Sequence, residues 1–399
     1  MEKRGSVTSR LPPFLLVVWL TAFGGCASAE NPELRAGSES FGERYWVRPV
    51  PLQGAMPDGF SALESSLYPR DCGACHQSQY ADWSGSLHSQ AVGPGLTGQL
   101  SPDRDPSFAA SCYLCHAPMS EQQEYLIVDG QYRKNPSFDE RLQKSGVSCG
   151  VCHLRGARRF GPPPLKKSPA SAVHGGFTPS SFFEESKFCA SCHQFPADGF
   201  SLNGKLLENT YNEWVESPYP EKGITCQRCH MPGRRHLFRG IHDPEMVKGG
   251  VDISVAVKDK GRKGVFLTIV NSNTGHYFPT YVTPLIVVTG ALLDETGDRV
   301  DGSVKEGYVG RRVALDLSRE VEDTRIPPLG RYDFDYLPGD FKEAATVRLE
   351  VWVHPDMFYN EFFKASLRGG FHTSKGDIEE ALDATERSPY LLYSWEREL

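Results

Sequence analysis

The sequence predicts an α+β protein, in which a loop-rich N-terminal domain with short helices precedes an antiparallel β-sandwich and a short helical tail. Two observations support this fold class. A Cys-x-x-Cys-His pentapeptide occurs five times within the first 230 residues and nowhere later. After residue 247 the chain alternates apolar and polar residues in short runs between Gly, Asp and Asn, which is typical of strands and turns. With 39 glycines and 29 prolines in 399 residues, much of the remainder is expected to be loop.

Each pentapeptide is the attachment motif of a c-type haem. Two thiols add across the haem vinyl groups, and the adjacent histidine binds the iron from one face. Two cysteines at this spacing could instead hold zinc or form a redox disulfide, but neither needs a histidine directly after the second cysteine. We therefore predict five covalently bound haem c groups, which organise the N-terminal domain. The attachment residues are Cys72, Cys75, Cys112, Cys115, Cys149, Cys152, Cys189, Cys192, Cys226 and Cys229, and the proximal ligands are His76, His116, His153, His193 and His230.

Residues 1–26 form an export signal, with a positively charged start and an apolar stretch over 11–23 that is too short to span a bilayer. Two cleavage sites compete. Phe23-Gly-Gly-Cys26 resembles a lipobox, which would make Cys26 the lipidated first residue of a lipoprotein. Ala27-Ser-Ala29 resembles an ordinary signal-peptide site, which would discard Cys26. Phe in place of the usual Leu weakens the lipobox, but a cysteine with no other purpose supports it. Either site exports the chain to the periplasm or the outer membrane and cell surface.

The composition argues against two classes of partner and site. The formal charge is −7 before haem propionates are counted, so nothing suggests nucleic-acid binding. Ten of the 11 cysteines lie in the motifs, so spare thiols cannot build a disulfide framework. A basic stretch from Arg155 to Lys167 is expected to face haem propionates or solvent.

Residues 27–70 are rich in Pro, Gly and Ser and are expected to form a leader or linker packed on the haem domain. The pentahaem cytochrome c domain then spans 71–246. The first cysteines of its motifs lie 40, 37, 40 and 37 residues apart, which suggests a duplicated two-haem unit. Short helices are expected to carry each motif's histidine and the turn that follows it.

Residues 247–355 are expected to form the β-sandwich, because period-two alternation recurs there without any haem motif. The strand-like runs are 251–257, 265–270, 284–293 and 347–353. The tail, 356–399, is expected to be helical around 377–387, where three apolar residues share one face and Thr373 or Ser374 could cap the helix.

The sixth coordination position of each iron bears on function. An iron with two protein histidines shuttles electrons, whereas an open iron can bind and transform a small ligand. Five of the 12 histidines are proximal ligands, and five of the other seven would complete an all bis-His protein. The predicted distal ligands are His88, His174, His236, His242 and His276.

The position of each candidate guides its assignment. His88 follows the first motif too closely to reach round its own haem, so a neighbouring iron is expected. His276 lies in the β domain, and a ligand donated from there would lock the two domains together. His354 ends a strand on the face that carries Arg348 and Glu350, so we expect it to be solvated. His372 is not assigned as a ligand.

Several segments resemble the multihaem cytochromes related to the tetrahaem electron carrier of ammonia oxidation. Cys72-Gly-Ala-Cys-His76, followed by Tyr80-Ala-Asp-Trp-Ser84 and His88, resembles their first-haem signature. Glu213–Ser217 running into Gly223–Pro232 is similar to a later-haem segment, and Asn273–Thr280 resembles the β domain attached to many of them. The resemblance implies bis-His haems in stacked pairs and electron transfer in respiratory chains. Some relatives polymerise into extracellular haem filaments, with one subunit donating a histidine to its neighbour's haem. Five motifs in place of four leave the haem order and the pairing of distal histidines open.

We therefore predict an exported pentahaem cytochrome that transfers electrons through stacked bis-His haems in a respiratory or extracellular electron-transfer chain. Its partners would be other cytochromes or a quinol-linked complex, with membrane attachment through Cys26 if that residue is lipidated, and with a homo-oligomer or filament as a further expectation. Two alternatives stay open. One is a reductase or oxidase of a small nitrogen or sulfur species at one open haem, and the other is a subunit of a conductive filament.

Overall fold

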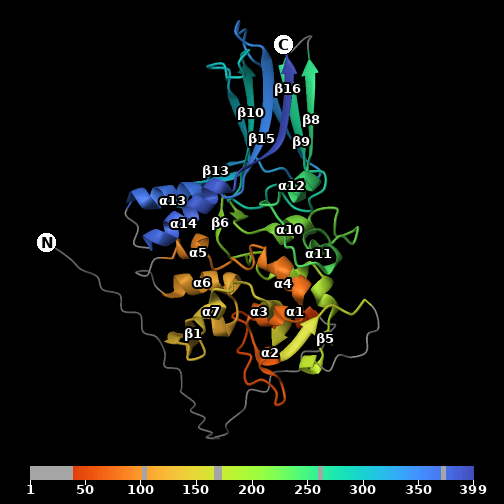
Figure 1. Cartoon of the computed structure of the whole chain (residues 1–399), viewed down its shortest axis with the longest axis vertical. Helices are drawn as coiled ribbons and strands as arrows, with labels where there is room; N and C mark the ends of the chain where they lie inside the picture. Colours follow the sequence, from red (N-terminus) through yellow and green to blue (C-terminus); the bar gives the residue numbers. More distant parts are fainter. Residues whose placement is uncertain (1–38, 101–105, 166–172, 259–263, 370–373) are drawn as a thin grey trace, which may run out of the picture. The chain divides into compact units, whose positions relative to one another are not determined.

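Short helices and loops build the chain up to residue 250, and antiparallel strands dominate after it (Figure 1). This computed structural model describes residues 39–100, 106–165, 173–258, 264–369 and 374–399, all of which belong to the unit Leu34–Leu399. The export signal with Cys26, and both Thr373 and His372, lie outside the described residues. No helix in the described ranges is long and apolar enough to cross a membrane. The predicted α+β class is confirmed.

The N-terminal part contains no long helix among its described residues. Its helices are α1 (Glu39–Tyr45), α2 (Ala62–Ser65), α3 (Pro69–Gly73), α4 (Gln77–Ser84), α5 (Pro94–Thr97), α6 (Pro106–His116), α7 (Glu140–Gln143), α8 (Cys149–His153), α9 (Lys187–Ala190), α10 (Thr210–Val215), α11 (Cys226–His230) and α12 (Pro244–Gly250). Single 3-10 turns are η1 (Ser120–Gln122), η2 (Val173–Gly175), η3 (Ser181–Glu184) and η4 (Pro232–Arg234). Short strands are β1 (Tyr125–Val128), β2 (Gln131–Lys134), β3 (Leu154–Arg155), β4 (Arg158–Gly161), β5 (Thr178–Pro179), β6 (Ser201–Leu202) and β7 (Lys205–Leu206).

Side chains of this part pack in several small clusters and not in one continuous core. Phe41 and Tyr45 of α1 are fully buried against Phe160 and Phe182, so the segment before the first motif packs on the haem-binding part. Other clusters centre on Met119 and on residues of α5. Small, separate clusters are what we expect of a domain organised by five haems, because each haem is a large apolar plate that can supply further core.

Arg155 differs in part from its sequence-based expectation. It is buried instead of solvated, and its Nε and Nη1 atoms donate to the carbonyl oxygens of Tyr45 and Val151 at 2.7 and 2.9 Å. Its buried Nη2 atom has no partner in the described part of the chain. A contact with a haem propionate therefore stays a prediction for that one atom.

Two antiparallel sheets form the predicted sandwich. Its strands are β8 (Asp252–Lys258), β9 (Gly264–Val270), β10 (Leu285–Leu293), β11 (Lys305–Val309), β12 (Arg311–Val313), β13 (Glu320–Asp323), β14 (Arg331–Tyr336), β15 (Thr346–His354) and β16 (Tyr390–Glu398). One sheet has the order β11-β10-β15-β16 and the other β14-β9-β8, while β12 and β13 pair separately. Strand β10 pairs β15 from Leu285↔His354 to Leu293↔Thr346. Alternate residues along β15 are buried, and they meet those of β9 and β10 in one core.

The tail differs from a purely helical segment. Helices α13 (Met357–Gly369) and α14 (Lys375–Arg387) pack together through Phe363, Ile378 and Ala381, and α14 lies against α5. The Ser374 side chain accepts a hydrogen bond from the N–H of Asp377, which confirms one of the two predicted caps. The chain then returns as β16, an edge strand of the sandwich that the sequence analysis did not predict. Only Leu392 of β16 is buried, so its apolar pattern is weak.

Candidate haem-binding site

One turn of helix organises the cysteines and histidine of each motif. Helices α8 and α11 coincide with the third and fifth motifs, the second motif ends α6, and the first and fourth begin in α3 and α9. In the first motif the N–H of His76 donates to the carbonyl of Cys72 at 2.9 Å, and His193 and Cys189 make the same bond at 3.0 Å. A helical turn brings residues four apart to one face, so two sulfurs and an imidazole point to the same side. The predicted short helices carry the motif histidine in α6, α8 and α11, whereas α3 and α9 end before His76 and His193.

Carbonyl groups fix the tautomer of most of these histidines. The Nδ1 atoms of His116, His153 and His230 lie 2.8, 2.7 and 2.5 Å from the carbonyl oxygens of Ala91, Phe160 and Arg239. A carbonyl can only accept, so each Nδ1 carries the proton and donates. The Nε2 lone pair then remains free for a metal.

Four of the five motif histidines face a second imidazole. The ring centroids are 6.4 Å apart in His76–His174, 6.2 Å in His88–His193, 6.2 Å in His153–His236 and 6.3 Å in His230–His276. The four second histidines are all predicted distal ligands. Each pair joins residues far apart in the sequence, so the fold and not local chain geometry produces the match.

These separations fit a metal ion held between the rings. A metal–imidazole nitrogen bond is about 2.0 Å, as in zinc sites, and the bonded nitrogen lies about 1.1 Å from the ring centre. Two imidazoles on opposite faces of one metal therefore have centroids about 6.2 Å apart. Two stacked rings in direct contact would lie closer than this. The motif cysteines are all free thiols, which is the form that adds to haem vinyl groups.

Burial favours the neutral form of three of the paired imidazoles. Desolvation lowers the pKa of His88 to about 3 and the pKa of His153 and His193 to about 4. Metal ligation needs an unprotonated nitrogen. These environments therefore favour the ligand form of the ring.

His116 of the second motif is the exception. Within the described ranges, no imidazole faces it as the other four are faced. The Nε2 atom of His242, the fifth predicted distal ligand, is 2.9 Å from the Oδ2 atom of Asp356, just before α13. Tyr359 of α13 lies close to Cys112 of the second motif. His354 lies at the end of β15 in a surface pocket of about 300 Å³ with Asp356 and Lys364.

Contacts between cysteines show which motifs adjoin. Three pairs of thiols lie close enough to shift one another's pKa: Cys72 with Cys149, Cys115 with Cys192, and Cys226 with Cys189. The first motif therefore adjoins the third, and the fourth adjoins both the second and the fifth. Cys152 is also close enough to Cys189 and Cys192 to raise the pKa of their thiols, so the third motif adjoins the fourth.

The comparisons with known proteins agree with this site. Residues 71–154, which contain the first three motifs, match a family model described as cytochrome c554 and c-prime. Residues 71–154 therefore carry the sequence pattern of a multihaem c-type cytochrome. A solved structure of similar fold is a penta-haem cytochrome c552 from Thermochromatium tepidum, with a TM-score of 0.61 and 20% sequence identity. The match covers 85% of this chain and all of that chain. No curated protein matches the sequence significantly.

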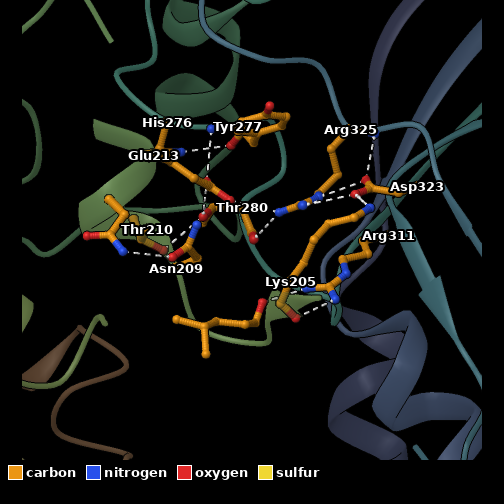
Figure 2. Close-up of polar contacts among 12 residues, drawn as sticks. Lys205, Asn209, Thr210, Glu213, His276, Tyr277, Thr280, Arg311, Asp323 and Arg325 are labelled. Atoms are coloured by element: carbon orange, nitrogen blue, oxygen red, sulfur yellow. Dashed lines mark hydrogen bonds and ion pairs between the residues drawn. The ribbon is translucent and has the colours of Figure 1, made fainter. Parts of the chain in front are cut away.

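Sequence reasoning missed several residues that support the histidines. The hydroxyl of Tyr281 lies 2.8 Å from Nδ1 of His193, and it comes from the segment that follows His276. Glu213 accepts hydrogen bonds from the segment that carries His276 (Figure 2). Neither residue lies in a motif, and only the fold brings them to the site. The one available signal was that Glu213 lies in a segment quoted for its family resemblance.

Proposed function

We propose that this cytochrome is exported, holds five haem c groups and transfers electrons between redox proteins. The observation that carries the proposal is the set of four facing imidazole pairs, each with a gap that fits one iron. Iron held by two histidines has no open position and exchanges electrons without binding a substrate. We assign the ten motif cysteines as haem attachment sites and the five motif histidines as proximal ligands.

The distal ligands follow from the pairs. We assign His174, His88, His236 and His276 to the first, fourth, third and fifth motifs. Haem c supplies reversible one-electron chemistry at its iron when bound. The chain's own residues hold the imidazoles in orientation, donate from Nδ1 to fixed acceptors and exclude water, and these three factors set the potentials.

The contacts between motifs support an electron path. The first motif adjoins the third, the third adjoins the fourth, and the fourth adjoins both the second and the fifth. We propose the order first, third, fourth and fifth, with the second as a branch from the fourth. The burial of His88 among His193, His116 and His230 supports the fourth motif as the centre of this arrangement.

A second candidate function has its own supporting observation. His116 has no facing imidazole within the described ranges, and His242 is turned toward Asp356. An iron with one open face can bind a small nitrogen or sulfur species and reduce or oxidise it. The branch position of the second motif would let the other haems supply or remove electrons.

Carbon monoxide binding separates the two functions. The purified holoprotein is reduced and titrated with carbon monoxide, and the oxidised form is examined by EPR. A low-spin protein that does not react would support a pure carrier and refute an open iron. A carbon monoxide spectrum of one haem equivalent, with a matching high-spin signal, would support chemistry at the second motif. Reaction at two or more haems would refute the four assigned pairs.

Location, anchoring and partners are further parts of the proposal. The signal-like N-terminus supports export, and Cys26 supports a lipid anchor at the outer membrane. The division into a haem domain over 71–246 and a β-sandwich from 247 follows the change from helices to strands. Intact mass of the membrane-extracted protein tests the haem count and the lipid anchor, because five haems and a lipidated Cys26 add distinct masses. A mass without either addition would refute that part.

A further inference from the structure

A buried ion pair lies where the haem-binding part meets the sandwich. Glu213 comes from α10, Arg325 follows β13, and an oxygen of the carboxylate lies 2.9 Å from Nη1 of Arg325. Their side chains are only 3% and 5% exposed. Withdrawing both charges from water is costly, and hydrophobic replacements often stabilise a protein as well or better. Stability alone is therefore a weak explanation for this pair.

The pair is hydrogen-bonded to the segment that carries His276 (Figure 2). The second oxygen of Glu213 accepts from the backbone N–H of Tyr277 at 3.1 Å and from the hydroxyl of Thr280 at 2.7 Å. The Nη1 atom of Arg325 also donates to the carbonyl of Thr280 at 2.9 Å. The residue directly after His276 and the residue four positions after it are thus fixed by the same two charged side chains.

Other contacts hold the His276 segment and the Arg325 side chain in place. The amide of Asn271 donates to the carbonyl of His276 at 2.9 Å, and Nδ1 of His276 lies 2.8 Å from the carbonyl of Tyr277. Asp323 holds the other side of the Arg325 guanidinium at 2.9 and 3.0 Å. His276 and His230 have the most nearly parallel rings of the four pairs, with 16° between their planes.

We propose that Glu213 and Arg325 are positioning residues that set the orientation of His276 against His230. This inference rests on the proposed ligation of the fifth haem by these two histidines. The acceptor oxygens fix the backbone beside His276, and the guanidinium fixes the carboxylate. Loss of the pair would let the imidazole rotate or leave the iron, although neither residue touches the haem ligand itself.

Burial raises the pKa of Glu213, while Arg325 and the hydrogen bonds oppose that rise. The pKa of the Glu213 carboxyl therefore depends on the same partners that it positions. This supports a role that depends on several simultaneous contacts and not on one.

The test compares Glu213→Ala and Glu213→Gln in the full holoprotein, with two spectroscopic readouts. The EPR g-values of low-spin iron between two imidazoles depend on the angle between the ring planes. We expect Glu213→Ala to lose the signal of the His230–His276 pair and to gain up to one haem equivalent of carbon monoxide binding. Glu213→Gln keeps an acceptor for Tyr277 but loses the charge facing Arg325, so we expect a low-spin haem with shifted g-values.

Glu320→Gln is the matched control. Glu320 is also a buried carboxylate between the two parts, with Arg311 at 2.8 Å and Lys205 at 2.9 Å, but these contacts do not involve the segment 271–280. Its substitution should leave both readouts unchanged. Equal changes in Glu320→Gln would overturn positioning in favour of a general connection between the parts.

The remaining outcomes are also decisive. Wild-type spectra in both Glu213 variants would overturn the inference. If Glu213→Ala yields no folded holoprotein, the g-values of Glu213→Gln decide alone. A separate His276→Ala variant distinguishes the two levels of the argument: if it leaves all haems low-spin, the ligation itself fails, whereas a new high-spin haem there with unchanged Glu213 variants overturns only the positioning role.

Discussion

Substitution of Tyr281 by Phe tests how the fold tunes a single haem. The Tyr281 hydroxyl lies 2.8 Å from Nδ1 of His193, which we propose as the proximal ligand of the fourth motif. When Nε2 binds iron, Nδ1 carries the proton and donates to the phenol oxygen. Desolvation holds the pKa of Tyr281 well above its usual value, so the phenol stays neutral. Donation from Nδ1 makes the imidazole a stronger electron donor, which stabilises oxidised iron.

Removal of this acceptor should raise the midpoint potential of that haem. A neutral hydrogen bond contributes about 0.5–1.5 kcal/mol, and a one-electron couple shifts by about 59 mV for each factor of ten. If the bond acts wholly on the oxidised state, the potential of the fourth haem rises by about 20–65 mV. If the hydrogen bond stabilises both oxidation states in part, the rise in potential lies near the lower end of this range.

Spectroelectrochemical titration of the holoprotein, with EPR to identify the haem, measures this shift. Tyr336→Phe is the control, because its buried hydroxyl also makes a 2.8 Å bond, but to the carbonyl of Ser303 inside the sandwich. We expect one component to move upward in Tyr281→Phe and none in Tyr336→Phe. A downward shift, or unchanged potentials at full haem content, would refute the reasoning.

Three further predictions concern stability, pH and capping. Leu349→Ala removes a fully buried side chain of β15 and should lower the free energy of unfolding by about 2–5 kcal/mol, measured by thermal or denaturant unfolding; a loss below 1 kcal/mol would contradict the assigned core. The backbone N–H of His174 donates to Glu64 and holds the pKa of that carboxyl at about 2. The ionised carboxylate therefore stabilises the folded state fully above the unfolded pKa, near 4.5, and this stabilisation is lost as pH falls toward 2. An acid titration of the low-spin spectrum should show this loss in the wild type and not in Glu64→Gln. Ser374→Ala should destabilise α14 by up to about 1 kcal/mol in the same unfolding assay, whereas an unchanged midpoint would show that the cap contributes nothing.

The parts of the fold that the sequence predicted are those with strong local patterns. A motif such as Cys149–His153 needs only one helical turn, and β15 shows its buried face by strict alternation. Strand β16 was missed because it is an edge strand that buries little and pairs with β15 through a shifted register. Its stability comes from a partner about 40 residues away, which no local window contains.

The candidate site divides in the same way. Histidine count and position predicted His88, His174, His236 and His276, and the structure sets each of these four opposite a motif histidine. His242 belonged to the same prediction and faces Asp356 instead. Local sequence distinguishes these cases poorly, because an imidazole that binds iron and one that donates to a carboxylate have similar neighbours. Their difference arises from contacts between distant segments.

One short segment of the sandwich contacts the histidines of two neighbouring motifs. His276 faces the histidine of the fifth motif, and Tyr281, five residues later, contacts the histidine of the fourth. The fourth and fifth motifs themselves adjoin through Cys189 and Cys226. A shift of this segment would therefore alter the ligation of one haem and the potential of the next together. Glu213 and Arg325 hold the segment between His276 and Tyr281. Substitution of Glu213 or Arg325 should therefore change the ligation of one haem and the potential of the next, whereas Tyr281→Phe should change the potential of only one haem.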